Sequence, residues 1–256
     1  MAIKTGTHGT MWAGRRGVLA GVIVVVVALS GAAGASARSS VAWAGYQANH
    51  DTFRSIQASW KVPFTTCPSR LGGSGESYSL VGLGSQADSI IGISVREGCA
   101  GTVPGFDTGY VFDQGASLVQ LPLDQGDHVS AKVLYRSGFY YLSFIDHTHA
   151  DSTWYQRIRC TKRFGTPCNR TGAGVFHGTF MPPLVGVLAN FGRLTFHQIA
   201  VTDQRGHRGS LAQNRFWTHT RFDLFNPNTD FALGPQATAS RLSQSGSRFS
   251  VSWRHY

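Results

Sequence analysis

The amino-acid sequence predicts an all-β protein, built as an antiparallel sandwich or barrel. Apolar and polar residues alternate with a period of two in many short segments from position 40 onward, and no segment has helical periodicity. Glycine accounts for 31 of the 256 residues, and aromatic residues make up 12%. Short strands joined by glycine-rich turns are typical of sandwiches and barrels.

The first 37 residues are predicted to be an export signal. Basic residues precede an uncharged, valine-rich run at 17–29, and a small-residue cleavage site ends at Ala37. The alternative is an uncleaved anchor, because the uncharged stretch at 17–35 approaches the roughly 20 residues that span a bilayer. The small residues at its end favour cleavage, so we expect a secreted protein that begins at Arg38.

The mature chain, residues 38–256, is long enough for one sizeable β domain. Neither a repeat nor a linker divides it, so we expect a single domain and a monomer. Removing the three basic residues of the leader from the formal charge of +10 leaves +7. In an exported protein this charge favours anionic wall or membrane surfaces over nucleic acid. The most basic stretch, 157–170, is explained equally well as a solvated hairpin edge.

Strands are predicted at positions spread along the whole mature chain. In chain order they are 56–62, 80–83, 90–95, 129–135, 139–145, 194–201 and 249–253. The segments at 129–135 and 139–145 flank a short turn that contains Gly138, which predicts a hairpin. The segment at 194–201 carries bulky residues on both faces.

The segment at 90–95 matters most for function because its two faces differ. Ile91, Ile93 and Val95 share one face, and Ile90, Gly92 and Ser94 share the other. If the face of Ile91 belongs to the core, the face of Ile90 lines the groove that the sheet encloses. The face of Ile90 carries no titratable group.

Four cysteines, all after the leader, predict two disulfides in an exported protein. Three connectivities are possible, and we predict the one that closes the shortest loops, Cys67 with Cys99 and Cys160 with Cys168. Zinc is the competing interpretation, but neither spacing is Cys-x-x-Cys. His147 and His149 share a strand face without an evident third ligand, so we expect no metal and no cofactor.

Several motifs resemble those of the eqolisins, the secreted glutamic endopeptidases. SVAWAGY at 40–46, FRSI at 53–56 and SWKVP at 59–63 are similar to the opening of that family. VLANFGRLTF at 187–196 resembles a late strand of the family, and FSVSW at 249–253 resembles its ending. The resemblance covers essentially the whole mature chain. It implies a sandwich of concanavalin (lectin-like) type, with substrate lying across a concave groove.

The chemistry of the family depends on a glutamate that acts as general base on a water and a glutamine whose amide stabilises the oxyanion. The resemblance assigns the glutamine position to Ile90 and the glutamate position to Gly174. Neither residue can replace its counterpart. The fallback carboxylates are Asp113, in Val-Phe-Asp where the family tends to have Trp-Tyr-Glu, and Glu97. Glu97 is seven residues from Ile90, which puts it on the opposite strand face, and Glu76 is expected in a solvated loop.

Three hypotheses follow. The main one is a non-catalytic module of the eqolisin scaffold that binds an extended peptide or a polysaccharide in its groove. The alternative is an active acid endopeptidase whose catalytic carboxylates have been relocated. The third is a basic protein that adheres to surfaces and has a vestigial groove.

Overall fold

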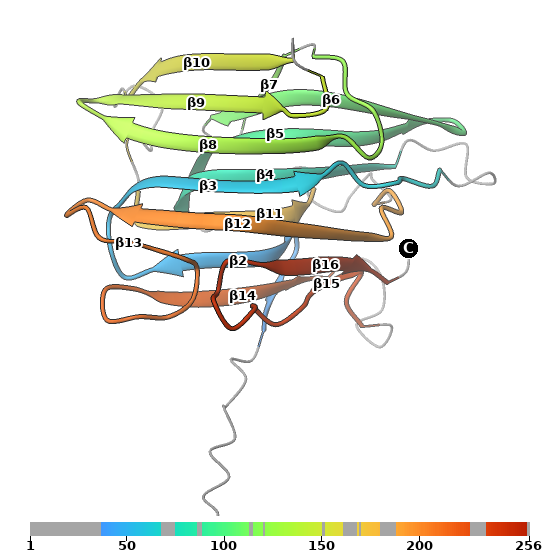
Figure 1. The fold of residues 1–256 in the computed structure, drawn as a ribbon. Helices are drawn as coiled ribbons and strands as arrows, with labels where there is room; N and C mark the ends of the chain where they lie inside the picture. Colours follow the sequence, from blue (N-terminus) through green and yellow to red (C-terminus); the bar gives the residue numbers. More distant parts are fainter. Residues whose placement is uncertain are drawn as a thin grey trace, which may run out of the picture. The chain divides into compact units, whose positions relative to one another are not determined.

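One curled β-sheet forms the body of the protein in the computed structural model (Figure 1). The structure describes residues 37–67, 75–85, 89–112, 115–119, 121–149, 152–160, 168, 170–179, 188–225 and 234–254. In these ranges the sheet has 16 strands and there is no helix. Accordingly, no helix in the described ranges is long and apolar enough to cross a membrane.

Every strand pair is antiparallel except β1 with β14, which is parallel. The strands are β1 (Arg38–Ser40), β2 (Trp43–Asn49), β3 (Phe53–Lys61), β4 (Glu76–Ser85), β5 (Ser89–Ala100), β6 (Val103–Phe112), β7 (Gly115–Val119), β8 (His128–Arg136), β9 (Phe139–Asp146), β10 (Thr153–Arg159), β11 (Gly172–Gly178), β12 (Arg193–Asp203), β13 (Arg208–Gly209), β14 (Thr218–Leu224), β15 (Ala237–Ala239) and β16 (Phe249–Trp253).

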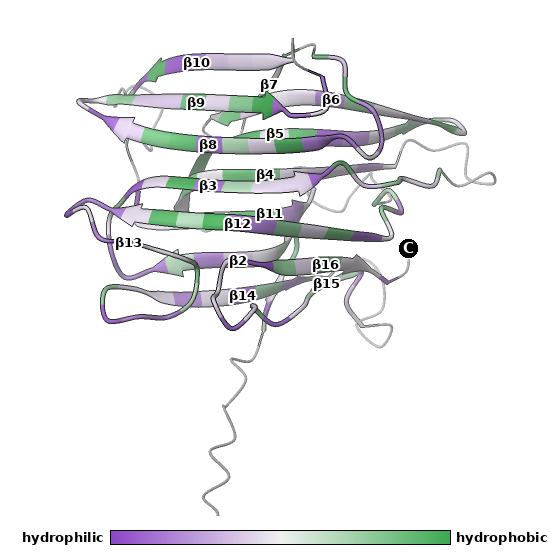
Figure 2. Cartoon of the chain, in the orientation of Figure 1, coloured by the Kyte–Doolittle hydropathy of each residue, from purple (hydrophilic) through white to green (hydrophobic). Residues whose placement is uncertain are grey.

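The sheet folds back on itself into two layers, which confirms the predicted β-sandwich. The front layer of Figure 1 runs β10-β9-β8-β3-β12-β16, and β15 leads from it into the back layer, β14-β2-β11-β4-β5-β6-β7. The main core lies between the layers, with Trp60 and Phe196 from the front and Tyr46 and Val81 from the back. Hydrophobic and paler residues alternate along β3, β8 and β12 (Figure 2). Because successive side chains of a strand point to opposite faces, this alternation places the hydrophobic residues on one face of the front layer.

The strand pair at the centre of the sequence prediction is present. β4 and β5 pair over ten residues, from Glu76 opposite Gly98 to Ser85 opposite Ser89. Ile91, Ile93 and Val95 point into the main core, as predicted. The predicted hairpin is also present as β8 and β9. Its two turn residues, Ser137 (φ 50°) and Gly138 (φ 79°), both have the positive φ that a tight two-residue turn requires.

A β-bulge explains why bulky residues fall on both predicted faces of β12. The pairing of β12 with β3 shifts between His197 and Ala200, and Gln198 has a φ of 54°. The extra residue reverses the alternation. Phe196 before the bulge and Ile199 after it therefore both reach the core.

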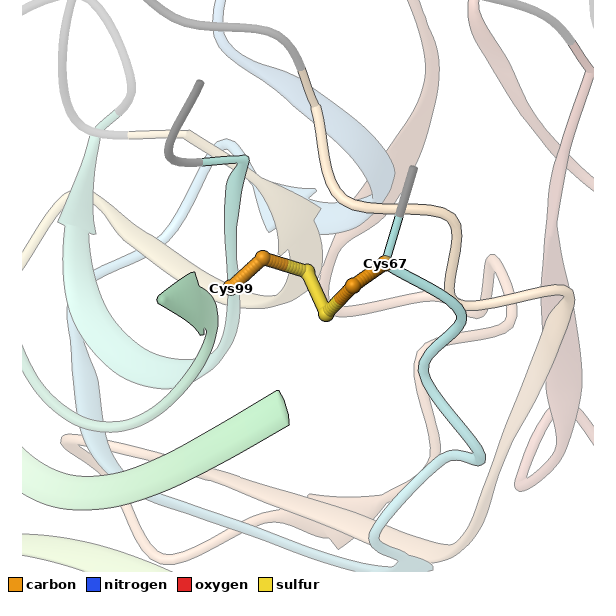
Figure 3. Close-up of a disulfide and its surroundings, with 2 residues drawn as sticks. All are labelled: Cys67 and Cys99. Atoms are coloured by element: carbon orange, nitrogen blue, oxygen red, sulfur yellow. A yellow bond between two sulfur atoms is a disulfide. The ribbon is translucent and has the colours of Figure 1, made fainter. Parts of the chain in front are cut away.

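Two disulfides attach loops to the sheet. Cys67 bonds to Cys99 at a Cα–Cα distance of 5.6 Å, joining the segment after β3 to the end of β5 (Figure 3). Cys160 bonds to Cys168 at 5.5 Å, joining the end of β10 to the approach to β11. This is the pairing predicted from the sequence.

Candidate functional site

The two positions that the resemblance assigns to the catalytic pair lie on the outer face of the back layer. Gly174 in β11 pairs with Gly82 in β4, and Ile90 in β5 pairs with Gly84, also in β4. Ile90 is on the opposite pleat from the core residue Ile91. One strand therefore separates the two positions, and both belong to the same face of the sheet.

Side chains of the protein itself cover this part of the face. A Cβ added at Gly174 would lie 2.0 Å from a ring carbon of Phe176. A Cβ added at Gly82 would lie 2.4 Å from the Cγ2 atom of Ile90, and Gly92 is covered in the same way by Leu80. The glycines thus form a floor on which apolar side chains rest. Position 174 has no room for a glutamate while Phe176 keeps its place.

The covered region is a second apolar cluster, separate from the main core. Its buried members are Trp43, Tyr78, Leu80, Ile90, Val111 and Phe176. The ionisable member, Tyr78, donates its hydroxyl to Glu76 at 2.9 Å, and burial raises its pKa to about 12. Among the buried members of this cluster in the described residues, none can take a proton from water at acid or neutral pH.

Glu97 lies on the other side of β5, between the layers, as its odd spacing from Ile90 predicts. It is fully buried and accepts hydrogen bonds from Ser77 at 2.7 Å and Ser79 at 2.8 Å. His177 Nε2 lies 3.6 Å from its carboxylate, and His177 Nδ1 lies 3.1 Å from the hydroxyl of Ser79. Burial raises the pKa of Glu97 to about 8 and lowers that of His177 to about 3. The structure does not bring Glu97 to the outer face.

The remaining carboxylates of the sequence analysis lie elsewhere. Asp113 is outside the described residues. Glu76 is not in a solvated loop as predicted, because it begins β4 and pairs with Arg96 at 2.7 Å. Arg96 also contacts Asp107 at 3.5 Å. These three side chains form an ion-pair cluster beside Tyr78, at the opposite end of β4 from Gly84.

A cleft of about 870 Å³ opens next to the covered region. Its lining is mostly hydroxyl and amide groups, with few charges: Arg38, Ser39, Ser40, Val41, Gln47, Asn49, His50, Asp51, Thr52, Ser85, Thr171, Thr220 and Phe222. Gln47 in β2 pairs directly with Gly174, so the cleft borders the assigned glutamate position.

The polar groups of the cleft are connected by hydrogen bonds. The Gln47 amide donates to the Asn49 side chain, and Asn49 donates to the Thr220 hydroxyl at 2.9 Å. Asp51 supplies a carboxylate, which accepts a hydrogen bond from the Thr52 amide at 2.6 Å. This cleft was not predicted from the sequence. The signal for it is that Gln47 and Asn49 share a face with Trp43 in an otherwise apolar strand.

Comparisons with known proteins agree with the fold and the motifs. Residues 41–229 match the model of the Peptidase A4 family. The structure is similar to scytalido-glutamic peptidase bound to a transition state analog inhibitor, with a TM-score of 0.65 and 17% identity over 85% of this chain and 100% of that one. It is also similar to SCP-B, an eqolisin in complex with the tripeptide Ala-Ile-His, with a TM-score of 0.63 and 18% identity over the same shares.

Aspergilloglutamic peptidase from Aspergillus niger is a further structural relative, with a TM-score of 0.58 and 15% identity over 70% of this chain and 99% of that one. No curated protein matches the chain at a significant level. The family model covers 189 of the 256 residues (41–229), and the structural relatives are matched over nearly their full length. The chain therefore belongs to the Peptidase A4 family, the eqolisins.

Proposed function

We propose that this protein is an exported eqolisin that holds an extended peptide in the cleft beside Gln47 without cleaving it. The observation that carries the proposal is the state of the two assigned catalytic positions. Ile90 is apolar, and Gly174 has no side chain and lies under the ring of Phe176. Acid proteolysis by the family route requires a general base and an oxyanion donor. These two positions supply neither.

The composition of the cleft supports a peptide ligand. An extended peptide presents N–H and C=O groups along its length, and amide and hydroxyl side chains bind both. Gln47, Asn49 and Thr220 are groups of this kind at one wall, and β1 forms another wall. The structurally similar SCP-B is described in complex with a tripeptide. A polysaccharide is the competing ligand.

Binding can be tested with fluorescein-labelled eight-residue peptides and, in parallel, soluble polysaccharides, using mature protein and fluorescence anisotropy or calorimetry. We expect the peptides to bind to the wild type. Thr220→Arg should abolish this binding, because the arginine side chain fills the cleft. Thr102→Arg is the matched control, because it adds the same side chain at an exposed turn. Binding of polysaccharides in place of peptides, or peptide binding that is indifferent to Thr220→Arg, would overturn the proposal.

The proposal includes secretion and adhesion to anionic surfaces. The predicted signal segment and the two disulfides support export. A hollow of about 570 Å³ on the front layer supports adhesion, because it is lined by the cations Lys132, Arg136 and Arg157 and by Tyr141 and Tyr155. Tyr155 is 67% exposed, and Arg157 stacks over Phe139 at 4.1 Å. An anionic chain would find charge and aromatic surface here together.

Sedimentation of mature protein with anionic phospholipid vesicles or teichoic-acid-bearing walls tests adhesion. We expect binding that salt weakens, because exposed charges are screened over about 8 Å at physiological ionic strength. The double variant Lys132→Gln/Arg157→Gln should weaken adhesion more than the double variant Arg193→Gln/Arg254→Gln. The second double variant removes the same charge elsewhere on the surface. Equal effects of the two pairs would refute a role for this hollow. Secreted material that retains residues 1–37 would refute cleavage after Ala37.

A further inference from the structure

Three histidines gather on the outer face of the front layer, away from the cleft. His128 begins β8, His147 directly follows β9, and His197 lies in β12. The rings of His128 and His197 have centroids 5.2 Å apart, and those of His128 and His147 have centroids 5.5 Å apart. His197 and His128 belong to strands on either side of β3, since His197 pairs with Ser59 and His128 pairs with Lys61.

The closest approach in this cluster is between two potential metal ligands. The Nε2 atoms of His128 and His197 lie 3.2 Å apart and share a hydrogen bond. Two nitrogens bound to one tetrahedral zinc ion at about 2.05 Å lie about 3.3 Å from each other. The imidazoles are therefore placed almost as a zinc ion would hold them. The small side chain of Ser59 between the two strands lets the rings meet above the sheet.

We propose that His128 and His197 bind a divalent transition metal of the zinc class through their Nε2 atoms, with His147 as the neighbouring third ligand. His147 Nε2 now lies 2.9 Å from the hydroxyl of Ser130. A side-chain rotation would exchange that hydroxyl for the metal. Water completes the tetrahedron.

Two features of the surroundings favour His197 as a ligand. First, burial, together with the charges of His128 and Arg248, lowers the pKa of His197, and the neutral imidazole is the form that binds metals. Second, the bulge at Gln198 follows His197 directly, and bulges re-aim side chains at functional sites. Arg248 and Lys61 bring positive charge to the region and oppose binding of a cation.

A second group of potential metal ligands lies close by, and any test has to distinguish metal binding at the two sites. His149 Nδ1 is 2.9 Å from Asp146 and 3.5 Å from Asp127, and the two carboxylates are buried. The three ligand atoms lie within 4.8 Å of one another. Each pair is also explained as a structural ion pair, because the hydrogen bond to Asp146 raises the pKa of His149. This group does not enter the proposal.

The test is calorimetric titration of the mature protein with Zn²⁺, and with Co²⁺ for its visible spectrum, at neutral pH. We expect one site with a tetrahedral Co²⁺ spectrum. His128→Gln and His197→Gln should each weaken binding by more than about tenfold, since loss of an outer partner of a metal ligand already costs that much. The matched controls are His50→Gln, at the cleft, and His149→Gln, in the second group of potential metal ligands.

Thermal unfolding gives a second readout. A metal that bridges β8 and β12 stabilises the native state by mass action, so Zn²⁺ should raise the Tm of the wild type and of His50→Gln. It should not raise the Tm of His128→Gln. Absence of Zn²⁺ binding by the wild type, binding that survives both His128→Gln and His197→Gln, or binding that His149→Gln abolishes would each overturn the proposal.

Discussion

Phe176 and Gly174 are two residues apart in β11 and therefore point to the same side of the sheet. The ring of Phe176 lies over Gly174, within 2.0 Å of where a Cβ would stand, and also over Gly45 of the neighbouring strand. The glycine and the aromatic ring thus form one packing unit. This unit occupies the place in which the family resemblance requires a carboxylate.

The packing unit predicts a strong coupling between the two positions. Gly174→Ala should reduce the free energy of unfolding by about 1–3 kcal/mol, because the added methyl group overlaps the ring. In a Phe176→Ala background the same change should cost much less, so the double-mutant cycle should give a clear interaction energy. Denaturant unfolding measures both. Gly105→Ala is the control, because a Cβ at Gly105 would have no atom within 4 Å. If Gly174→Ala lowers the free energy of unfolding equally in the wild-type and Phe176→Ala backgrounds, the overlap is refuted.

Glu97 and His177 are both buried between the layers, and burial shifts their pKa values in opposite directions. Burial raises the pKa of Glu97 from 4.5 to about 8, so its contribution to stability is complete below pH 4.5 and is lost as the pH rises through 8. Burial lowers the pKa of His177 from 6.5 to about 3, so its contribution is complete above pH 6.5 and is lost as the pH falls toward 3. Together they favour maximal stability between about pH 4.5 and 6.5.

Glu97→Gln should remove the alkaline loss and leave the acid loss in place. Relative to this variant, the wild type should lose stability between pH 4.5 and 8, at a limiting slope of about 1.4 kcal/mol per pH unit. Urea unfolding midpoints across that range provide the measurement. Parallel pH profiles for the two proteins would show that Glu97 ionises normally in the fold.

Strands and their connections show which features local sequence determines. The β8–β9 hairpin was predictable because its alternation and its two-residue turn agree. The bulge in β12 was not, since nothing near Gln198 in the sequence distinguishes an extra residue from a strand with two apolar faces. β1 was also missed, because three residues that pair with the distant β14 carry no pattern of their own.

The two disulfides close loops of different length, which predicts different effects of their removal. Cys67 and Cys99 are 32 residues apart, and Cys160 and Cys168 are 8 apart. On the loop-entropy model, replacing the first pair by serines should cost about 4 kcal/mol, and replacing the second about 2.5 kcal/mol. Denaturant unfolding of the two double variants tests the order. A larger loss from the shorter loop would contradict the entropic account.

The curled sheet gives the molecule two outer faces with different chemistry. The back layer carries the covered glycine floor and the polar cleft, and the front layer carries the basic hollow and the histidines. The β-sandwich was predictable, and so was the placement of Ile90 and Ile91 on opposite faces, because period two fixes which residues share a side. The expectation that the face of Ile90 lines an open groove was wrong at Ile90 itself, which is buried in the second apolar cluster and does not line the cleft. The cleft was not, since it joins Arg38, Gln47 and Thr220 from three separate segments. The approach of His128 to His197 likewise depends on strand order.

An endopeptidase assay tests the proposal that this eqolisin binds peptides without cleaving them. Purified mature protein is incubated with unfolded casein from acid to neutral pH, beside Asp51→Asn, Glu97→Gln and Asp113→Asn. Loss of a single oxyanion donor costs about 10²–10³ in rate, and here the base position is empty as well. We expect no cleavage above the blank at any pH. Robust cleavage by the wild type at any pH would contradict the account, and its loss in Asp51→Asn, Glu97→Gln or Asp113→Asn would show that the catalytic site has moved.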